Sequence, residues 1–278
     1  MRVTIVPNQR RPGVGKLPVP ENRRAWLPQQ ARFCPVLEDA SRSGFLVYPP
    51  LATNESFQVR LLEHHVFRLS FFIEDESGTS RRVAVIDYQP AAGTGGVDAQ
   101  DVRFVEPAAP IDENDALALF DALTTNVNSP PGGIGIRGAY DFVTPEGWDT
   151  IYLGVLNEQQ RPHVPTLTAR VETDWYAQNT EFRYVLAPGD VLSAAGSAPV
   201  GQVLFVPREE MELHAASEEE VARFQEAGRR YWAERATKQR VTNFGALYTY
   251  HYRELQKARR GAGRSTAGEV EPPPHEEA

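Results

Sequence analysis

The residues best suited to chemistry in this 278-residue chain lie between positions 170 and 183. Glu172 and Asp174 are two positions apart in a stretch typical of a strand, so both side chains are expected on the same face. Two close carboxylates can bind a divalent ion, or raise each other's pKa for acid–base work. We therefore predict Glu172 as a catalytic base and Asp174 as a second carboxylate, with Trp175 as a stacking wall for a substrate. Arg170 or Arg183 would attract an anionic substrate.

A structural interpretation competes with this site. The two carboxylates could cap a turn while Trp175 packs in the core.

Histidine and cysteine offer few metal ligands. His64 and His65 are adjacent, so on a strand they point to opposite faces and cannot easily share an ion. An iron site of the two-histidine, one-carboxylate type would combine His65, His163 and Glu172. Cys34 is the only cysteine, which excludes an intrachain disulfide and every multi-cysteine metal site. No cofactor is evident, and a divalent metal stays open.

The overall composition is that of an ordinary globular protein, with 41% hydrophobic and 24% charged residues. The net charge is −8, so nucleic acid is not the expected partner of the whole molecule. No apolar stretch approaches the ~18 residues that a membrane span needs, and the first residues do not have the pattern of a signal peptide. We therefore expect a cytoplasmic protein without a membrane partner.

Strand patterns dominate the first 210 residues. Residues 1–30 are expected to form an extended arm anchored by Trp26, and residues 31–210 a β-rich core domain. Runs that alternate at period two and favour β-branched and aromatic residues predict strands at 45–48, 57–62, 66–73, 82–88, 134–136, 150–156, 167–175, 181–186 and 202–206. Residues 90–110 are expected to be a loop, and 112–124 a single internal helix. The fold class is therefore mainly β, with a β-barrel, β-clip-like or sandwich core.

The C-terminal part changes character. Ser217 and Glu220 form a capping box that opens a helix, and a second helical stretch contains Leu247 and Leu255. Residues 211–260 are thus expected to be helices packed on the core, and residues 261–278 a disordered tail. Basic and aromatic residues are interleaved in these helices, which suits an acidic partner, nucleic acid or a solvated helix face. We favour the solvated face, with the acidic tail covering the basic patch.

One stretch resembles a bacterial family of unknown function. Val171-Glu-Thr-Asp-Trp175 is similar to the most distinctive motif of that family. Its other features would correspond to Arg24-Ala-Trp26 and Arg32-Phe-Cys-Pro35, followed by Gly44-Phe45. The resemblance spans most of residues 20–235 and implies a shared fold without a defined activity.

The order of elements between 145 and 206 also resembles the dUTPase-like β-clip barrel. This resemblance implies that Glu172 takes the place of the water-activating carboxylate and Trp175 that of the aromatic residue that packs on the sugar. Gly201-Gln202 would lie in the closing strand. Residues 152–162 depart from the family because they lack its Arg-Ser-Gly phosphate-binding segment, which puts triphosphate binding in doubt.

Two classes of function follow. The first is a binding or accessory protein that holds a peptide, a partner protein or a small molecule, and a homodimer is compatible with it. The alternative is an enzyme of the β-clip type that acts on a small molecule or nucleotide through Glu172 and Asp174. A degenerate metal-dependent oxygenase on a β-barrel is a third possibility. The binding protein is preferred because the enzyme would need residues that this chain lacks.

Overall fold

The chain is mainly β, as predicted, with strands in 35% and helices in 24% of its residues. The computed structural model describes residues 1–21, 27–28, 31–62, 66–90, 97–103, 111–125, 130–158, 164–241, 245 and 247–265. It divides into two compact units. The first unit comprises Met1–Trp26 and Ala40–Glu210, and the second comprises Leu27–Asp39 and Met211–Ala278. No helix in the described part of the chain is both long and apolar enough to cross a membrane.

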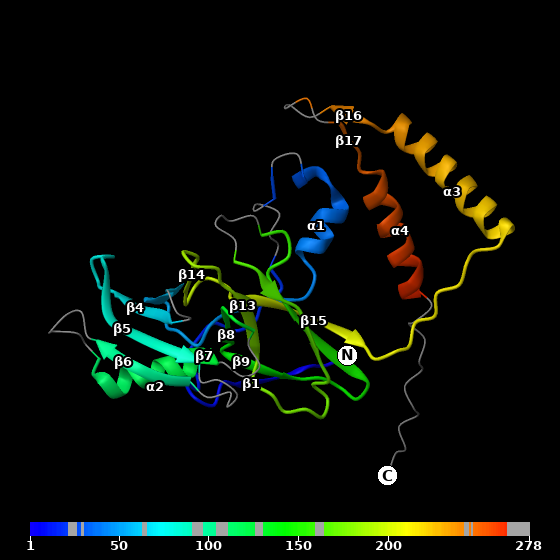
Figure 1. Cartoon of the computed structure of the whole chain (residues 1–278). Coiled ribbons are helices and arrows are strands. Elements are labelled where there is room, and N and C mark those ends of the chain that lie inside the picture. Colours follow the sequence, from blue (N-terminus) through cyan, green and yellow to red (C-terminus); the bar gives the residue numbers. More distant parts are fainter. Residues whose placement is uncertain are drawn as a thin grey trace, which may run out of the picture. The chain divides into compact units, whose positions relative to one another are not determined.

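The first unit contains the strands β1 to β15 and the helix α2 (Figure 1). The bounds are β1 (Thr4–Pro7), β2 (Phe45–Val47), β3 (Glu55–Leu61), β4 (Phe67–Glu74), β5 (Ser80–Pro90), β6 (Val97–Arg103), α2 (Glu113–Leu123), β7 (Thr124–Thr125), β8 (Gly133–Arg137), β9 (Tyr140–Val143), β10 (Trp148–Leu153), β11 (Thr166–Leu167), β12 (Ala169–Val171), β13 (Glu181–Val185), β14 (Val191–Ala195) and β15 (Gly201–Pro207).

Antiparallel pairing arranges these strands in four sheets. Their orders are β14-β3-β4-β5-β6, β12-β10-β15-β2, β11-β13-β8-β7 and β1-β9. Within the described ranges no sheet closes on itself, so the predicted barrel is not established.

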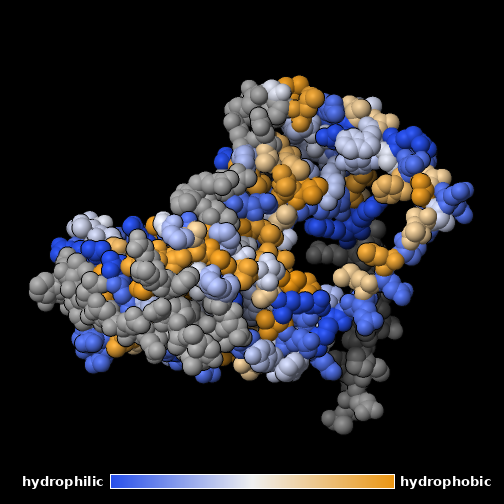
Figure 2. All heavy atoms as spheres, in the orientation of Figure 1, coloured by the Kyte–Doolittle hydropathy of each residue, from blue (hydrophilic) through white to orange (hydrophobic). Residues whose placement is uncertain are grey.

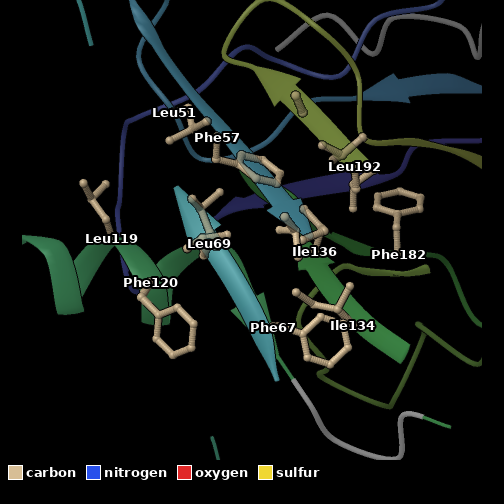
Figure 3. Packing of buried hydrophobic residues seen from close by; sticks show 14 of the residues in the cluster. Leu51, Phe57, Phe67, Leu69, Leu119, Phe120, Ile134, Ile136, Phe182 and Leu192 are labelled. Carbon is tan, nitrogen blue, oxygen red and sulfur yellow. The ribbon is translucent and has the colours of Figure 1, made fainter. Parts of the chain in front are cut away.

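The core of this unit follows from the alternation of its strands. On β3, Phe57 and Val59 are buried, and they lie opposite Phe71 and Leu69 of β4. Their apolar side chains therefore share one face of the sheet, as period two requires. Phe182 of β13 belongs to the same cluster (Figure 3). This cluster also receives Leu119 and Phe120 of α2, so one core joins strands from all four sheets to the helix.

The internal helix is confirmed close to its predicted bounds. Asp112 is its N-cap and forms a capping box with Asp115, in which each side chain accepts a hydrogen bond from the other residue's backbone N–H. Carboxylates in this first turn also interact favourably with the helix dipole.

One expected loop is wrong. Residues 90–110 include strand β6, which pairs antiparallel with β5 along Val97–Arg103. The sequence of β6 has no apolar alternation. It is an edge strand whose backbone bonds to β5, and backbone pairing leaves little trace in side-chain pattern.

The second unit contains the C-terminal helices and a segment from near the start of the chain. Its elements are the 3-10 turn η2 (Ala31–Phe33), most of α1 (Pro35–Ser41), α3 (Glu218–Thr237), β16 (Arg240–Val241), β17 (Leu247–Tyr248) and α4 (His251–Ser265). The capping box of Ser217 and Glu220 opens α3, as predicted. Leu247 lies in a strand and not in a helix, because β16 and β17 form a hairpin before α4 begins. Helix α4 continues to Ser265, past residue 260 where the glycine-rich sequence predicted its end.

Gly201 tests the packing of the core. A Cβ at this position would collide with the ring of Phe182, which is 1% exposed. We expect Gly201→Ala to lower the free energy of unfolding by about 1–3 kcal/mol, the usual cost of overpacking a core. Adding Phe182→Leu to Gly201→Ala should recover part of that loss, so the two effects will not be additive. Denaturant unfolding of the two single variants and the double variant measures this.

Gly228 provides the matched control. A Cβ there would meet nothing within 4 Å, and the residue lies inside α3. Gly228→Ala should therefore stabilise the helix by about 0.5–1 kcal/mol. Additive losses from Gly201→Ala and Phe182→Leu would contradict the proposed collision.

Candidate functional site

The predicted pair of carboxylates lies in a turn and not on a strand. Strand β12 ends at Val171, and Glu172 opens a turn in which its carbonyl accepts hydrogen bonds from the backbone N–H of Trp175 at 3.4 Å and of Tyr176 at 3.0 Å. Thr173 anchors the turn to β10, because it is buried and its hydroxyl lies 2.7 Å from that of Thr150. The same-face argument from strand geometry is therefore wrong at these positions.

Arg208 nevertheless brings the two carboxylates together. Its Nη2 donates to Asp174 Oδ1 at 2.7 Å, and its Nη1 lies 3.4 Å from Glu172 Oε2. The same guanidinium donates from Nε to Asp149 Oδ1 at 2.8 Å. Sequence reasoning missed Arg208 and Asp149, because these partners are far from residues 172–174 along the chain.

Strand pairing explains this convergence. Asp149 lies on β10, where it is opposite Val206 of β15, so Arg208 follows two residues later beside the start of β10. On the other side of β10, Arg170 of β12 lies opposite Ile151, and its Nε donates to Asp149 Oδ2 at 2.6 Å. The carboxylate of Asp149, which is 2% exposed, is thus held by two arginines.

Trp175 lies at the surface. Its indole is 68% exposed, so the alternative that packed it in the core is wrong. The indole Nε1 donates to Glu172 Oε2 at 2.5 Å, and the ring is 5.6 Å from that of Tyr176. A half-exposed carboxylate, an exposed indole and a tyrosine therefore share one patch of surface.

The electrostatics of this cluster favour charged carboxylates. Burial raises the pKa of Asp149, but hydrogen bonds from Arg208 and Arg170 lower it more, so the net pKa lies below the ordinary value. The hydrogen bond from Arg208 lowers the pKa of Asp174, and the backbone N–H of Gly147 adds to this at 2.9 Å. These bonds in turn raise the pKa of Arg208.

This arrangement is suited to fixing β10, β12 and the end of β15 to one another. A role for Glu172 as a base or Asp174 as a metal ligand would compete with the bonds to Arg208 and Trp175, and the catalytic roles stay predictions. In the described part of the chain no group of three or more His, Cys, Asp or Glu side chains is arranged to bind a metal ion. His64, His65 and His163, and the anchor Trp26, lie outside the described residues.

Arg183 belongs to a different cluster. Its Nη2 donates to Glu181 Oε2 at 3.1 Å, and it lines a cavity of about 50 Å³ with Tyr152 and Val171. Val171 and Arg170 are neighbours on β12 and so point to opposite faces, which separates Arg183 from the Arg208 cluster. A cavity of this size has room for one or two water molecules and not for a substrate.

A larger cavity lies in the second unit, and we call it the aromatic pocket. It measures about 320 Å³ and is lined by Phe33, Cys34, Pro35, Val36, Tyr231, Trp232, Arg235, Leu247, Tyr248, Thr249 and Tyr252. Five of these side chains are aromatic. Sequence reasoning noted the aromatic residues of the C-terminal helices but did not join them to residues 33–36.

An ion-pair cluster brings the early segment into this unit. Arg253 of α4 donates to Asp39 Oδ1 at 2.6 Å, to Glu38 Oε2 at 3.1 Å and to the carbonyl of Pro35 at 3.2 Å. Gln256 adds a bond to Asp39 Oδ2 at 2.8 Å. Burial raises the pKa of Asp39, but the hydrogen bonds from Arg253 and Gln256 lower it by more, so the net pKa lies below the ordinary value. Glu38 and Asp39 therefore fasten α1 to the first two turns of α4.

A second contact joins α3 to α4 beside the pocket. His251 is 1% exposed and its ring stacks on Tyr231 with centroids 5.2 Å apart. His251 Nε2 lies 3.3 Å from Glu234 Oε2, and Nδ1 lies 3.2 Å from Lys238 Nζ. These contacts position Tyr231 and the next residue, Trp232, on the pocket wall.

The pocket combines apolar walls with a cation. The ring of Phe33 lies 5.9 Å from that of Tyr248, and the guanidinium of Arg235 lies over Trp232 at 4.8 Å from the ring centre. Trp232 is 59% exposed and Leu247 64% exposed, so apolar surface surrounds the pocket. Figure 2 shows hydrophobic side chains at the surface over the hairpin and α1.

Comparison with known proteins gives no relative for this chain. No protein-family model, no curated protein and no solved structure matches it. The two resemblances proposed from sequence therefore stay predictions.

Arg208 can be tested through the pH dependence of stability. The pKa values of Asp149 and Asp174 are lowered in the folded protein, so the stabilisation they provide is complete above about pH 4 and is lost as the pH falls through the lowered values. Arg208→Met leaves Asp149 buried with one arginine fewer, and we expect the melting temperature at pH 7 to fall by several degrees. The difference from the wild type should shrink as the pH falls from 4 to about 2. Thermal unfolding followed by circular dichroism measures both.

Arg81→Met is the control for this prediction. Arg81 pairs with Asp75 at 3.0 Å at the surface, where ion pairs contribute little. A loss in Arg208→Met that is equally large at pH 2 and pH 7 would show that the charge of the carboxylates is not its cause.

Proposed function

We propose that this protein is a binding protein that holds an acidic, apolar segment of a partner protein in the aromatic pocket. The observation that carries this proposal is a cavity of about 320 Å³ with five aromatic side chains in its walls, and among its described lining residues Arg235 is the charged one. Ligand pockets are usually of this size or larger, mostly apolar, with a few polar groups that orient the ligand. The Arg235 guanidinium would bind a carboxylate, and the rings would enclose an adjacent aliphatic or aromatic side chain.

The charge of the C-terminal region supports an acidic ligand. Residues 221–264 contain eleven Lys and Arg but only three Asp and Glu, although the whole chain has a net charge of −8. No described carboxylate pairs with Lys257 or Arg259, which are exposed on α4. A positive surface steers an acidic partner and raises the rate of association.

The exposed aromatic surface supports a protein partner over a small ligand. Tryptophan, tyrosine and arginine are the residues that most often dominate binding energy at protein interfaces. Here Trp232, Tyr250 and Leu247 are each at least 59% exposed, so a partner would also cover apolar area outside the pocket. The Arg208 cluster supports this function less well, because its carboxylates already bind arginine.

Selection of peptides tests this function. A phage-displayed library of random short peptides is panned against the full chain, and selected peptides are synthesised. We expect peptides with Asp or Glu next to a large apolar residue. Tyr252→Ala should weaken their binding at least about thirtyfold, since truncation of an aromatic residue that dominates an interface costs about 2 kcal/mol or more. Binding is measured by fluorescence anisotropy of labelled peptides.

Cys34 gives an independent readout, because it lines the pocket and is the only cysteine. A bound peptide should slow the reaction of Cys34 with a thiol reagent. The matched control is Tyr176→Ala, which removes a 49% exposed tyrosine of the first unit and should leave binding unchanged. Selected peptides that bind Tyr252→Ala as tightly as the wild type, or that leave Cys34 equally reactive, would refute the proposal.

A further inference from the structure

The C-terminal tail, residues 266–278, has the chemistry that the aromatic pocket would bind. Its sequence, Thr-Ala-Gly-Glu-Val-Glu-Pro-Pro-Pro-His-Glu-Glu-Ala, contains four glutamates, no Lys or Arg, and three consecutive prolines. Proline-rich segments adopt an extended left-handed helix and dock into aromatic-lined grooves with little loss of entropy. The tail therefore combines the acidic and apolar features required of a ligand for this pocket.

The length of the chain fits this occupant. Tyr252 lies in the first turn of α4 and lines the pocket, whereas α4 ends at Ser265. The helix rises about 20 Å between these two residues, at about 1.5 Å per residue. The seven residues from Thr266 to Pro272 span about 23–25 Å when extended. A tail that turns back along α4 thus brings its prolines level with the pocket.

The charges along this path are complementary. Lys257, Arg259 and Arg260 are exposed on α4 between the pocket and the helix end. Glu269 and Glu271 precede the prolines, so they would pass this basic stretch as the tail returns. The attraction between these opposite charges favours the returning path over one directed away from the helix.

We propose that residues 269–274 occupy the aromatic pocket of their own chain, with Pro272–Pro274 against the aromatic walls and the glutamates beside the α4 cations. This inference rests on the proposed function, since it makes the tail a built-in competitor of the partner segment. A partner must then displace the tail. The pocket therefore binds only those ligands that compete successfully with a weak ligand tethered beside it. The tether supplies an effective concentration in the millimolar range, so even a weak tail would occupy the site.

Deletion of residues 266–278 is the first test. With the tail removed, Cys34 should react several-fold faster with a thiol reagent, and a library-selected peptide should bind about three- to tenfold more tightly. A synthetic peptide of residues 268–278 should bind the deleted chain and slow Cys34 again. In the full chain, Glu269→Gln with Glu271→Gln should act like a partial deletion, and added salt should reduce the difference.

Controls separate this proposal from the alternatives. Glu276→Gln with Glu277→Gln changes the same charge beyond the prolines and should have a smaller effect. In Tyr252→Ala the deletion should no longer change Cys34 reactivity. An effect of the tail that grows with protein concentration would mean that it binds a second copy, and would overturn the intramolecular contact.

The outcomes also distinguish the two proposals. Selected peptides that need Tyr252, together with a deletion that changes neither Cys34 reactivity nor affinity, would overturn the tail as occupant and leave the binding function standing. A deletion that exposes Cys34 while no peptide is selected, even with the deleted chain, would overturn the binding function and leave the tail contact.

Discussion

The C-terminal unit depends on one guanidinium. Arg253 binds Asp39, Glu38 and the carbonyl of Pro35, and so joins segments more than 210 positions apart. Because Phe33 and Cys34 directly precede this anchor, their side chains reach Tyr248 and Tyr252 and complete the aromatic pocket. Burial opposes the ionisation of Asp39, yet the hydrogen bonds from Arg253 and Gln256 keep its pKa below the ordinary value. Neutral pH therefore favours the closed unit.

In the first unit an arginine also joins carboxylates from segments far apart in the sequence, but the result is a closed ion-pair cluster. Arg208 binds three carboxylates of β10 and of the turn after β12, and Arg170 shares the most buried of them. The cluster that looks most like an active site in the sequence is thus satisfied by its own cations. In the aromatic pocket Arg235 is the charged group at the wall, and the apolar side chains of Trp232 and Leu247 remain exposed. An open apolar cavity with a cation is suited to recognition, whereas a closed ion-pair cluster is suited to stability.

Much of the fold could be predicted because local rules were sufficient. Alternation located β3, β4 and β5 within a few residues, and the capping boxes of Asp112 and Ser217 located the starts of α2 and α3. Prediction was wrong where contacts with residues distant in the sequence determine the local structure. Strand β6 pairs with the edge of β5. Strand β12 ends at Val171 because the following turn brings Thr173 to Thr150 and Asp174 to Arg208.

The sequence by itself determined the mainly-β class, the internal helix, the change to basic helices after residue 210 and the acidic, proline-rich tail. It also identified Glu172, Asp174 and Trp175 as neighbouring residues whose side chains are suited to catalysis or binding. Only the tertiary structure decided that Arg208 binds the two carboxylates, that the indole is exposed and that residues 33–36 form a wall of the aromatic pocket. The reason is that periodicity and capping act within a few residues, whereas ion pairs and cavities join side chains that no local pattern relates.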